Sequence, residues 1–336
     1  MIRTVPLMST IVTIHVVDDA VDDRRVPEVE LATERAFGWF RQVEACCTRF
    51  DPKSEVMQLT SNIGVPVRAS EILREAVQFA LAVAEETGGA FDPTVGASME
   101  TRGFNRNYRT GRTVDTALAP DAGVSYRDVQ VDPDRNTITL LRPLILDLGA
   151  VAKGLAIDMA ARELRPFRNF AIDAGGDLYL AGRNRDGEPW SVGIRHPRLD
   201  GQLVECLRVS DVAVCTSGDY ERRREAGNHI LDPRSGASAS AVASATVVAT
   251  TAMAADALAT AAFVLGPAEG MRLFERQGVD GLIVSPTLER YATHGLSAFG
   301  PTILSHAERP AHHRLRRAGR GGRERRGDRE GRAGAG

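Results

Sequence analysis

The sequence has few of the residues that build zinc-binding, disulfide-stabilised or membrane-spanning proteins. Its 336 residues include four cysteines, two of them adjacent, and none forms a CxxC pair. This pattern predicts neither a zinc site nor a disulfide framework. No apolar run approaches the ~20 residues that cross a bilayer, and the N-terminus lacks the apolar core and cleavage site of a signal peptide. We therefore expect a cytoplasmic protein without membrane insertion.

The commonest motifs for nucleotide binding and serine activation are also missing. Neither the Walker A pattern nor the Rossmann GxGxxG pattern occurs, which disfavours P-loop and dinucleotide-binding folds. Ser217 is a candidate nucleophile, but no GxSxG elbow surrounds it. We therefore interpret Thr216-Ser217-Gly218 first as a turn.

Charge is distributed unevenly along the chain. The net charge is −2, yet residues 306–336 hold ten arginines against four acidic residues. This Arg/Gly-rich tail has almost no apolar residues, so residues 305–336 are expected to be disordered. Basic charge is compatible with nucleic-acid binding, but the tail has no aromatic residues for base stacking, and we expect no nucleic-acid partner.

Hydrophobic periodicity predicts a mixture of strands and helices. Alternating apolar residues indicate strands, and apolar residues three and four apart indicate helices. The predicted strands are 9–17, 137–141, 144–146, 170–173, 178–180, 212–215, 246–250 and 281–285. The predicted helices are 28–47, 69–86, 147–164, 252–265 and 268–277. Because short strands and long connections alternate without a repeat or linker, we predict one α+β domain, residues 1–304, rather than a doubly wound fold.

Two polar residues stand out in the alanine-rich helix predicted at 252–265. Asp256 and Thr260 are four residues apart, so their carboxylate and hydroxyl share one helix face. Two hard oxygen donors suit Mg²⁺, which often works beside substrate phosphates. Alternatively, Asp256 is a buried capping residue and Thr260 bonds back to a helix carbonyl.

Three further features are compatible with phosphate chemistry. The Gly175-Gly176 pair lets main-chain amides approach a phosphate, and Lys153 near a helix start adds positive charge. His229, three residues before Asp232, is the histidine best placed for acid/base work. The alternative is that His229 only supports the local turn.

Seven short motifs follow one another along the chain. They are Ser54-Glu55 with Asn62, Gly89-Ala90-Phe91-Asp92-Pro93-Thr94-Val95-Gly96, Asp147-Leu148-Gly149-Ala150-Val151-Ala152-Lys153-Gly154, Ala174-Gly175-Gly176-Asp177, Thr216-Ser217-Gly218-Asp219-Tyr220, His229-Ile230-Leu231-Asp232-Pro233-Arg234-Ser235-Gly236 and Ala255-Asp256-Ala257-Leu258-Ala259-Thr260. Each is weak alone, but together they resemble the ApbE family of FAD:protein FMN transferases over most of residues 5–300. The resemblance implies the T-fold-like architecture of that family.

The resemblance implies an enzyme that binds FAD with Mg²⁺, splits the pyrophosphate and places FMN on a threonine hydroxyl of a target protein, releasing AMP. It implies metal binding by Ala150, Asp256 and Thr260, and catalysis by His229 and Asp256. The residues it implies for FAD binding are Met8, Phe91, Asp92, Asp147 and Lys153, with Gly175, Gly176, Thr216 and Ser217 lining the same cleft.

Two other functions remain compatible with these residues. The same site with water as acceptor would be a Mg²⁺-dependent FAD pyrophosphatase, giving free FMN and AMP. A flavin-binding protein without catalysis is the third reading, against which the presence of Asp256, Thr260 and His229 argues. Many relatives are exported lipoproteins, whereas no export signal or lipidation cysteine is seen here, so the acceptor protein is not identified by the resemblance.

Overall fold

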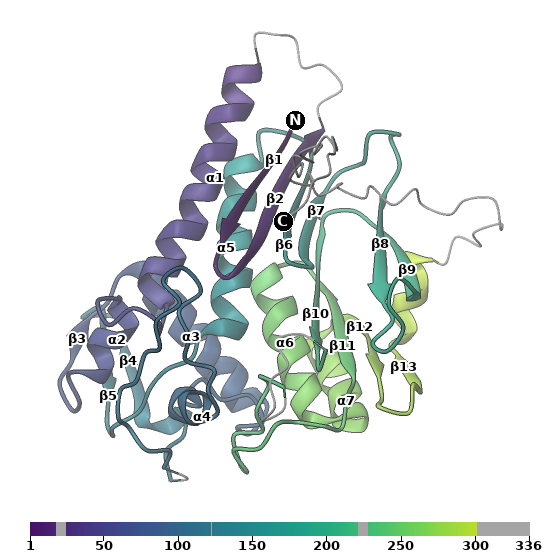
Figure 1. Cartoon of the computed structure of the whole chain (residues 1–336). Coiled ribbons are helices and arrows are strands. Elements are labelled where there is room, and N and C mark those ends of the chain that lie inside the picture. Colours follow the sequence, from purple (N-terminus) through teal and green to yellow (C-terminus); the bar gives the residue numbers. More distant parts are fainter. Residues whose placement is uncertain (18–24, 122, 221–227, 301–336) are drawn as a thin grey trace, which may run out of the picture. The chain divides into compact units, whose positions relative to one another are not determined.

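An eight-stranded antiparallel sheet organises the protein in a computed structural model, which describes residues 1–17, 25–121, 123–220 and 228–300 (Figure 1). Its strands, in spatial order, are β1 (Ile2–Leu7), β2 (Thr10–Val17), β6 (Asn169–Ala174), β7 (Asp177–Ala181), β10 (Val212–Gly218), β11 (Ser244–Ala249), β12 (Asp280–Val284) and β13 (Arg290–Ala292). All neighbouring strands in it run antiparallel. The α+β prediction is confirmed, and the predicted tail, 305–336, lies outside the described residues.

Five longer helices accompany this sheet. They are α1 (Val26–Cys47), α3 (Glu71–Glu86), α5 (Gly149–Leu164), α6 (Ala252–Leu265) and α7 (Pro267–Gln277). The shorter helical elements are α2 (Glu55–Thr60), α4 (Gly96–Thr101) and the 3₁₀ helices Tyr126–Asp128 and His294–Phe299. A small sheet contains, in spatial order, β3 (Val67–Arg68), β5 (Thr137–Leu140) and β4 (Val129–Asp132). A separate hairpin is formed by β8 (Trp190–Arg195) and β9 (Leu203–Val209). None of the described helices is long and apolar enough to cross a membrane.

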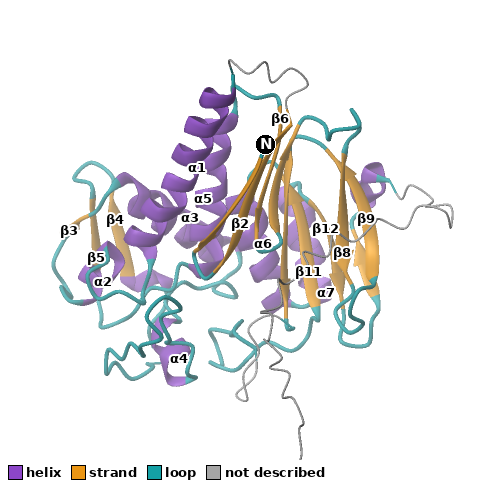
Figure 2. Cartoon of the chain, turned by 45° about the horizontal axis from the view of Figure 1, so that its top comes forward, coloured by secondary structure: helices purple, strands orange, loops and turns teal. Residues whose placement is uncertain are grey.

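The centre of the large sheet is buried on both faces, whereas its edge strands β1 and β13 are largely exposed. On β11, Val247 points into the main core among the helices, whereas its neighbour Val248 points into a second core with the β8–β9 hairpin. Successive strand residues face opposite sides of a sheet. Burial of both faces therefore explains why every residue of β11 is apolar, small or hydroxylated. Figure 2 shows helices α1, α3, α5, α6 and α7 on one side of the sheet and β8–β9 on the other.

Side-chain hydroxyls cap the N-termini of two of these helices. Thr251 precedes α6, and its side-chain oxygen accepts the Ala254 N–H at 3.3 Å. Ser70 caps α3 in the same way through the Leu73 N–H. These hydroxyls satisfy backbone donors that a helix leaves unpaired in its first turn.

Two predictions of local structure are wrong. Residues 144–146 are buried but form only an isolated bridge, between Ile145 and Val95, and no strand. Their carbonyls bond to helix ends instead: the Thr60 hydroxyl, at the end of α2, donates to the Leu144 carbonyl, and the Gly96 N–H, at the start of α4, donates to the Ile145 carbonyl. Thr216-Ser217-Gly218 is not a turn but the end of β10, since β11 pairs with it through Gly218. The sequence interpretation also missed β1 and the β8–β9 hairpin.

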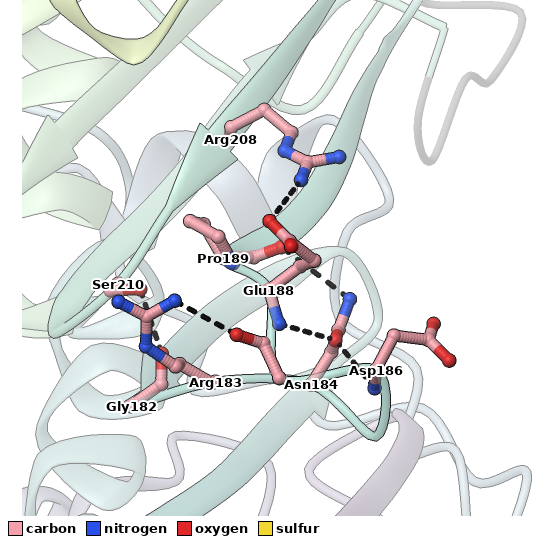
Figure 3. Close-up of polar contacts among 9 residues, drawn as sticks. Gly182, Arg183, Asn184, Asp186, Glu188, Pro189, Arg208 and Ser210 are labelled. Atoms are coloured by element: carbon pink, nitrogen blue, oxygen red, sulfur yellow. Dashed lines mark hydrogen bonds and ion pairs between the residues drawn. The ribbon is translucent and has the colours of Figure 1, made fainter.

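A polar loop, residues 182–189, connects β7 to this hairpin (Figure 3). Asn184 Oδ1 accepts the N–H groups of Asp186 and Glu188, at 2.9 and 3.1 Å. The Glu188 carboxylate pairs with Arg208 of β9 at 3.0 Å. The polar groups of this loop therefore bond to one another and tie the hairpin to the rest of the fold.

Candidate active site

A cavity of about 1050 Å³ lies among α5, α6, β10, the end of α1 and the segments 90–110 and 229–233, and we call it the central cavity. The predicted site residues that line it are Met8, Phe91, Asp92, Asp147, Ala150, Lys153, Thr216, Ser217, His229, Asp256 and Thr260. Residues as far apart in the sequence as Met8 and Thr260 thus contribute to one site. Gly175 and Gly176 are not among its lining residues.

Asp256 and Thr260 lie one turn apart on α6, as the helix periodicity predicts. The Thr260 hydroxyl is 3.0 Å from the hydroxyl of Ser217 on β10. Asp256 is 6% exposed and does not cap α6, whose N-cap is Thr251. The alternative that Asp256 is a capping residue is therefore wrong, and the cavity holds a carboxylate beside two hydroxyls.

Lys153 and Asp177 form an ion pair at the wall of the cavity. Burial acts to lower the pKa of Lys153, but the carboxylates of Asp177 and Asp256 outweigh it and raise that pKa above its ordinary value. Asp177 is 2% exposed and also accepts the Thr216 N–H at 3.2 Å. Lys153 is therefore cationic at neutral pH and links α5 electrostatically to the carboxylates of β7 and α6.

The Gly175-Gly176 turn joins β6 to β7 immediately before Asp177. Both glycines have positive φ, and a side chain on Gly175 would lie within 2.0 Å of the Thr10 hydroxyl. The predicted bend of the chain is confirmed. Its glycines form the tight turn that leads into Asp177.

Asp147 joins the start of α5 to the end of α1. One of its oxygens accepts the Gly149 N–H at 2.8 Å, and the other pairs with Arg49 at 2.6 Å. The Arg49 side chain is 3% exposed and also donates to the Phe104 carbonyl. Arg49 lines the cavity but is not among the site residues predicted from the sequence. No local sequence pattern shows that an arginine following a helix will be buried.

Asp92 serves a turn within the predicted motif of residues 89–96. Its carboxylate accepts the N–H and hydroxyl of Thr94 and the N–H of Tyr126. Burial raises the pKa of Asp92, although these three donors act against the rise. The Asp147 N–H donates to the Pro93 carbonyl, so this motif and the one that opens α5 are joined through their backbones.

His229 lies on a loop that lines the cavity, with its ring 6.5 Å from the ring of Phe104. Asp232, three residues later, pairs with Arg234 at 2.9 Å and is not among the lining residues. His229 therefore faces the cavity, whereas Asp232 contributes to the local turn.

The chemistry of the donors fits a hard cation better than zinc. In the described part of the chain, no three His, Cys, Asp or Glu side chains are grouped as a metal site. The oxygens of Asp256, Thr260 and Ser217 are together at the cavity, and Ala150 lines it from the first turn of α5. Magnesium accepts such a sparse oxygen set because it retains water and substrate ligands.

Comparison with known proteins gives the class of this fold and site. The sequence model of the ApbE family matches residues 8–283, so the chain belongs to the ApbE family. The FAD:protein FMN transferase of Treponema pallidum is 31% identical over 299 residues, covering 81% of this chain and 82% of that protein. The one of Vibrio cholerae is 33% identical over 227 residues, covering 65% and 68%.

Solved structures agree with this assignment. The ApbE protein of Thermotoga maritima has a TM-score of 0.78 at 29% identity, covering 90% of this chain and 99% of that one. The flavin transferase ApbE of Vibrio cholerae has a TM-score of 0.75 at 25% identity, covering 89% and 98%. The predicted family architecture is therefore confirmed.

Proposed function

We propose that this member of the ApbE family is a Mg²⁺-dependent transferase that moves FMN from FAD to a threonine hydroxyl of an acceptor protein. The observation that carries the proposal is that five of the seven motifs contribute residues to the central cavity, where Lys153, Asp256 and Thr260 all line the wall and the Asp256 carboxylate acts on the Lys153 ammonium. The names of the relatives support FAD as donor and a protein as acceptor. We propose in addition that the reaction needs Mg²⁺, that the acceptor group is a threonine hydroxyl and that AMP is released.

FAD is bound mainly by groups from the first half of the chain. Met8 and Phe91 line the cavity and provide apolar surface for the flavin. Lys153 provides positive charge for the pyrophosphate, and the start of α5 places backbone N–H groups nearby. Asp147 and its partner Arg49 brace this end of α5.

The metal donors of the proposal are Asp256, Thr260 and Ala150. When bound there, Mg²⁺ supplies charge neutralisation at the nonbridging phosphate oxygens. The hydroxyl of Ser217 holds that of Thr260, and Lys153 shares in balancing the carboxylate of Asp256.

The transfer step exchanges one P–O bond for another. The threonine oxygen of the acceptor attacks the phosphorus of the FMN half of FAD, and the bridging P–O bond breaks with AMP as leaving group. His229 faces the cavity and accepts the proton of the attacking hydroxyl. The product is an FMN phosphoester of the acceptor.

The test is to incubate the full chain with FAD, Mg²⁺ and a threonine-bearing fragment of a flavoprotein, then to weigh both proteins by mass spectrometry. A matched fragment with valine in place of that threonine is the control. We expect one FMN on the threonine fragment, none on the valine fragment, and AMP equal to the FMN transferred. Free FMN with unmodified fragments would instead indicate a pyrophosphatase, and unchanged FAD would indicate a binding protein.

A further inference from the structure

A buried carboxylate outside the central cavity connects the two helices that carry the proposed metal donors. Asp158 of α5 is 9% exposed, and its two oxygens accept the N–H groups of Ala252 and Met253 at 2.7 and 2.9 Å. Burial raises its pKa to about 6, while these two donors act against the rise. Asp158 is therefore ionised at neutral pH and bonds two otherwise unpaired donors at the N-terminus of α6.

The same face of α5 is shaped to let α6 approach. Gly154 is one helical turn before Asp158, and Ala150 is one turn before Gly154. A side chain at Gly154 would lie within 2.5 Å of the Ala252 carbonyl oxygen and of Met253 Cα. The Asp158 hydrogen bonds and the Gly154 contact thus fix the first turn of α6 against α5.

This role differs from ordinary capping of α6. Thr251 already caps the helix from its own end through the Ala254 N–H. Asp158 instead reaches the first turn from another helix, 94 residues earlier in the chain. Asp256 follows Met253 by less than one turn, and Thr260 follows Asp256 by one more.

We propose that Asp158 is a positioning residue that sets the distance between the metal donors of α6, Asp256 and Thr260, and the donor of α5, Ala150. The inference rests on the proposed function, because the donor set is the one proposed there. Asp158 is not among the residues that line the central cavity, and it acts through the first turn of α6. Its loss therefore alters metal affinity rather than the chemistry of the donors.

The test is a pair of variants of the full chain, Asp158→Asn and Thr251→Ala. Asparagine keeps the volume of Asp158 but presents an NH₂ group to one of the two backbone donors. Thr251→Ala removes the cap of the same helix and leaves the link between α5 and α6 intact. Free Mn²⁺, measured by electron paramagnetic resonance during titration, reports the affinity of the site without any turnover.

We expect Asp158→Asn to weaken Mn²⁺ binding by about 10- to 100-fold, the usual effect of removing a group that orients metal ligands. Thr251→Ala should lower the melting temperature but bind Mn²⁺ as the parent chain does. Equal Mn²⁺ affinity of Asp158→Asn and the parent chain would overturn the proposal and leave Asp158 a capping group.

If Asp158→Asn does not fold, the same Mn²⁺ titration is made with Asp158→Glu. Glutamate keeps the charge but displaces the contact by one methylene, so Mn²⁺ affinity should fall while both backbone donors retain an acceptor. Parent-like affinity of this variant would overturn the inference. Absence of Mn²⁺ binding by the parent chain would overturn the proposed metal site itself, and the positioning role with it.

Discussion

Two polar regions of this protein differ in how far their ion pairs are exposed to solvent. Glu188 of the β7–β8 loop forms an ion pair with Arg208 of β9, and their side chains are 57% and 33% exposed. At the central cavity, Arg49 and Asp147 pair with side chains that are 3% and 18% exposed. Exposed pairs contribute about 0–1 kcal/mol, whereas burying two charges has a desolvation cost of several kcal/mol per ion. The Glu188–Arg208 pair therefore fits a structural role at the hairpin. The buried Arg49–Asp147 pair fits a functional site, where charged groups are retained despite the cost of burying them.

Among variants that keep the metal donors, His229→Ala should have the largest effect. We expect the rate of FMN transfer to fall by about 10²- to 10⁴-fold, because general acid/base groups contribute on that scale. FAD affinity, measured by flavin fluorescence, should change little, since His229 acts mainly in the transition state.

The matched control is His196→Ala on the hairpin side, where the His196 Nδ1 only accepts backbone N–H groups. This variant should transfer FMN at the parent rate. A near-normal single-turnover rate for His229→Ala, together with weaker FAD binding and lower thermal stability, would reduce His229 to support of its loop.

The next largest effect is a difference in the free energy of unfolding between two variants, each of which breaks the ion pair of one region. Arg49→Met should lower the free energy of unfolding by about 3–5 kcal/mol, because it leaves Asp147 as a charge without its buried partner. Arg208→Met should lower it by no more than about 1 kcal/mol. Urea denaturation of both variants measures the difference, and equal values would show that burial does not separate the two regions.

The smallest expected effect concerns His15, which packs edge-on against Trp190 of the hairpin. Burial and the nearby Arg185 lower the pKa of His15 to about 4. The folded protein therefore resists protonation of this ring, and its contribution to stability is present above pH 6.5 and lost as the pH falls through 4.

Denaturation at several pH values between 4 and 7 checks this prediction against a His15→Gln variant. The parent chain should lose more stability than the variant as the pH is lowered. Parallel curves for the two proteins would mean that the pKa of His15 is the same in the folded and unfolded states.

The sequence predicts the parts of the site that depend on local geometry. Asp256 and Thr260 share a helix face because four residues make about one turn, and this needs no knowledge of the fold. The partners of Lys153 and Asp147 depend on which distant segments meet. Asp177 is 24 residues from Lys153 and Arg49 is 98 residues from Asp147, so no local pattern reveals either pair.

The errors in the predicted fold have the same origin. Residues 144–146 are apolar because they are buried, and burial alone does not distinguish a strand from a loop whose carbonyls bond to the ends of neighbouring helices. The glycine after Ser217 predicts a turn, but pairing with β11, which lies later in the chain, extends the strand to Gly218. Strand ends are set by non-local partners.

The proposed function makes the central cavity, and Asp256 within it, responsible for Mg²⁺-dependent transfer of FMN. The most direct measurement is FMN transfer to the threonine fragment by Asp256→Ala at saturating Mg²⁺, with the melting temperature of the same sample. Glu188→Ala in the β7–β8 loop is the matched carboxylate control. We predict that Asp256→Ala remains folded and loses Mg²⁺-dependent transfer, while Glu188→Ala transfers FMN normally. A folded Asp256→Ala protein with the parent rate would contradict the account.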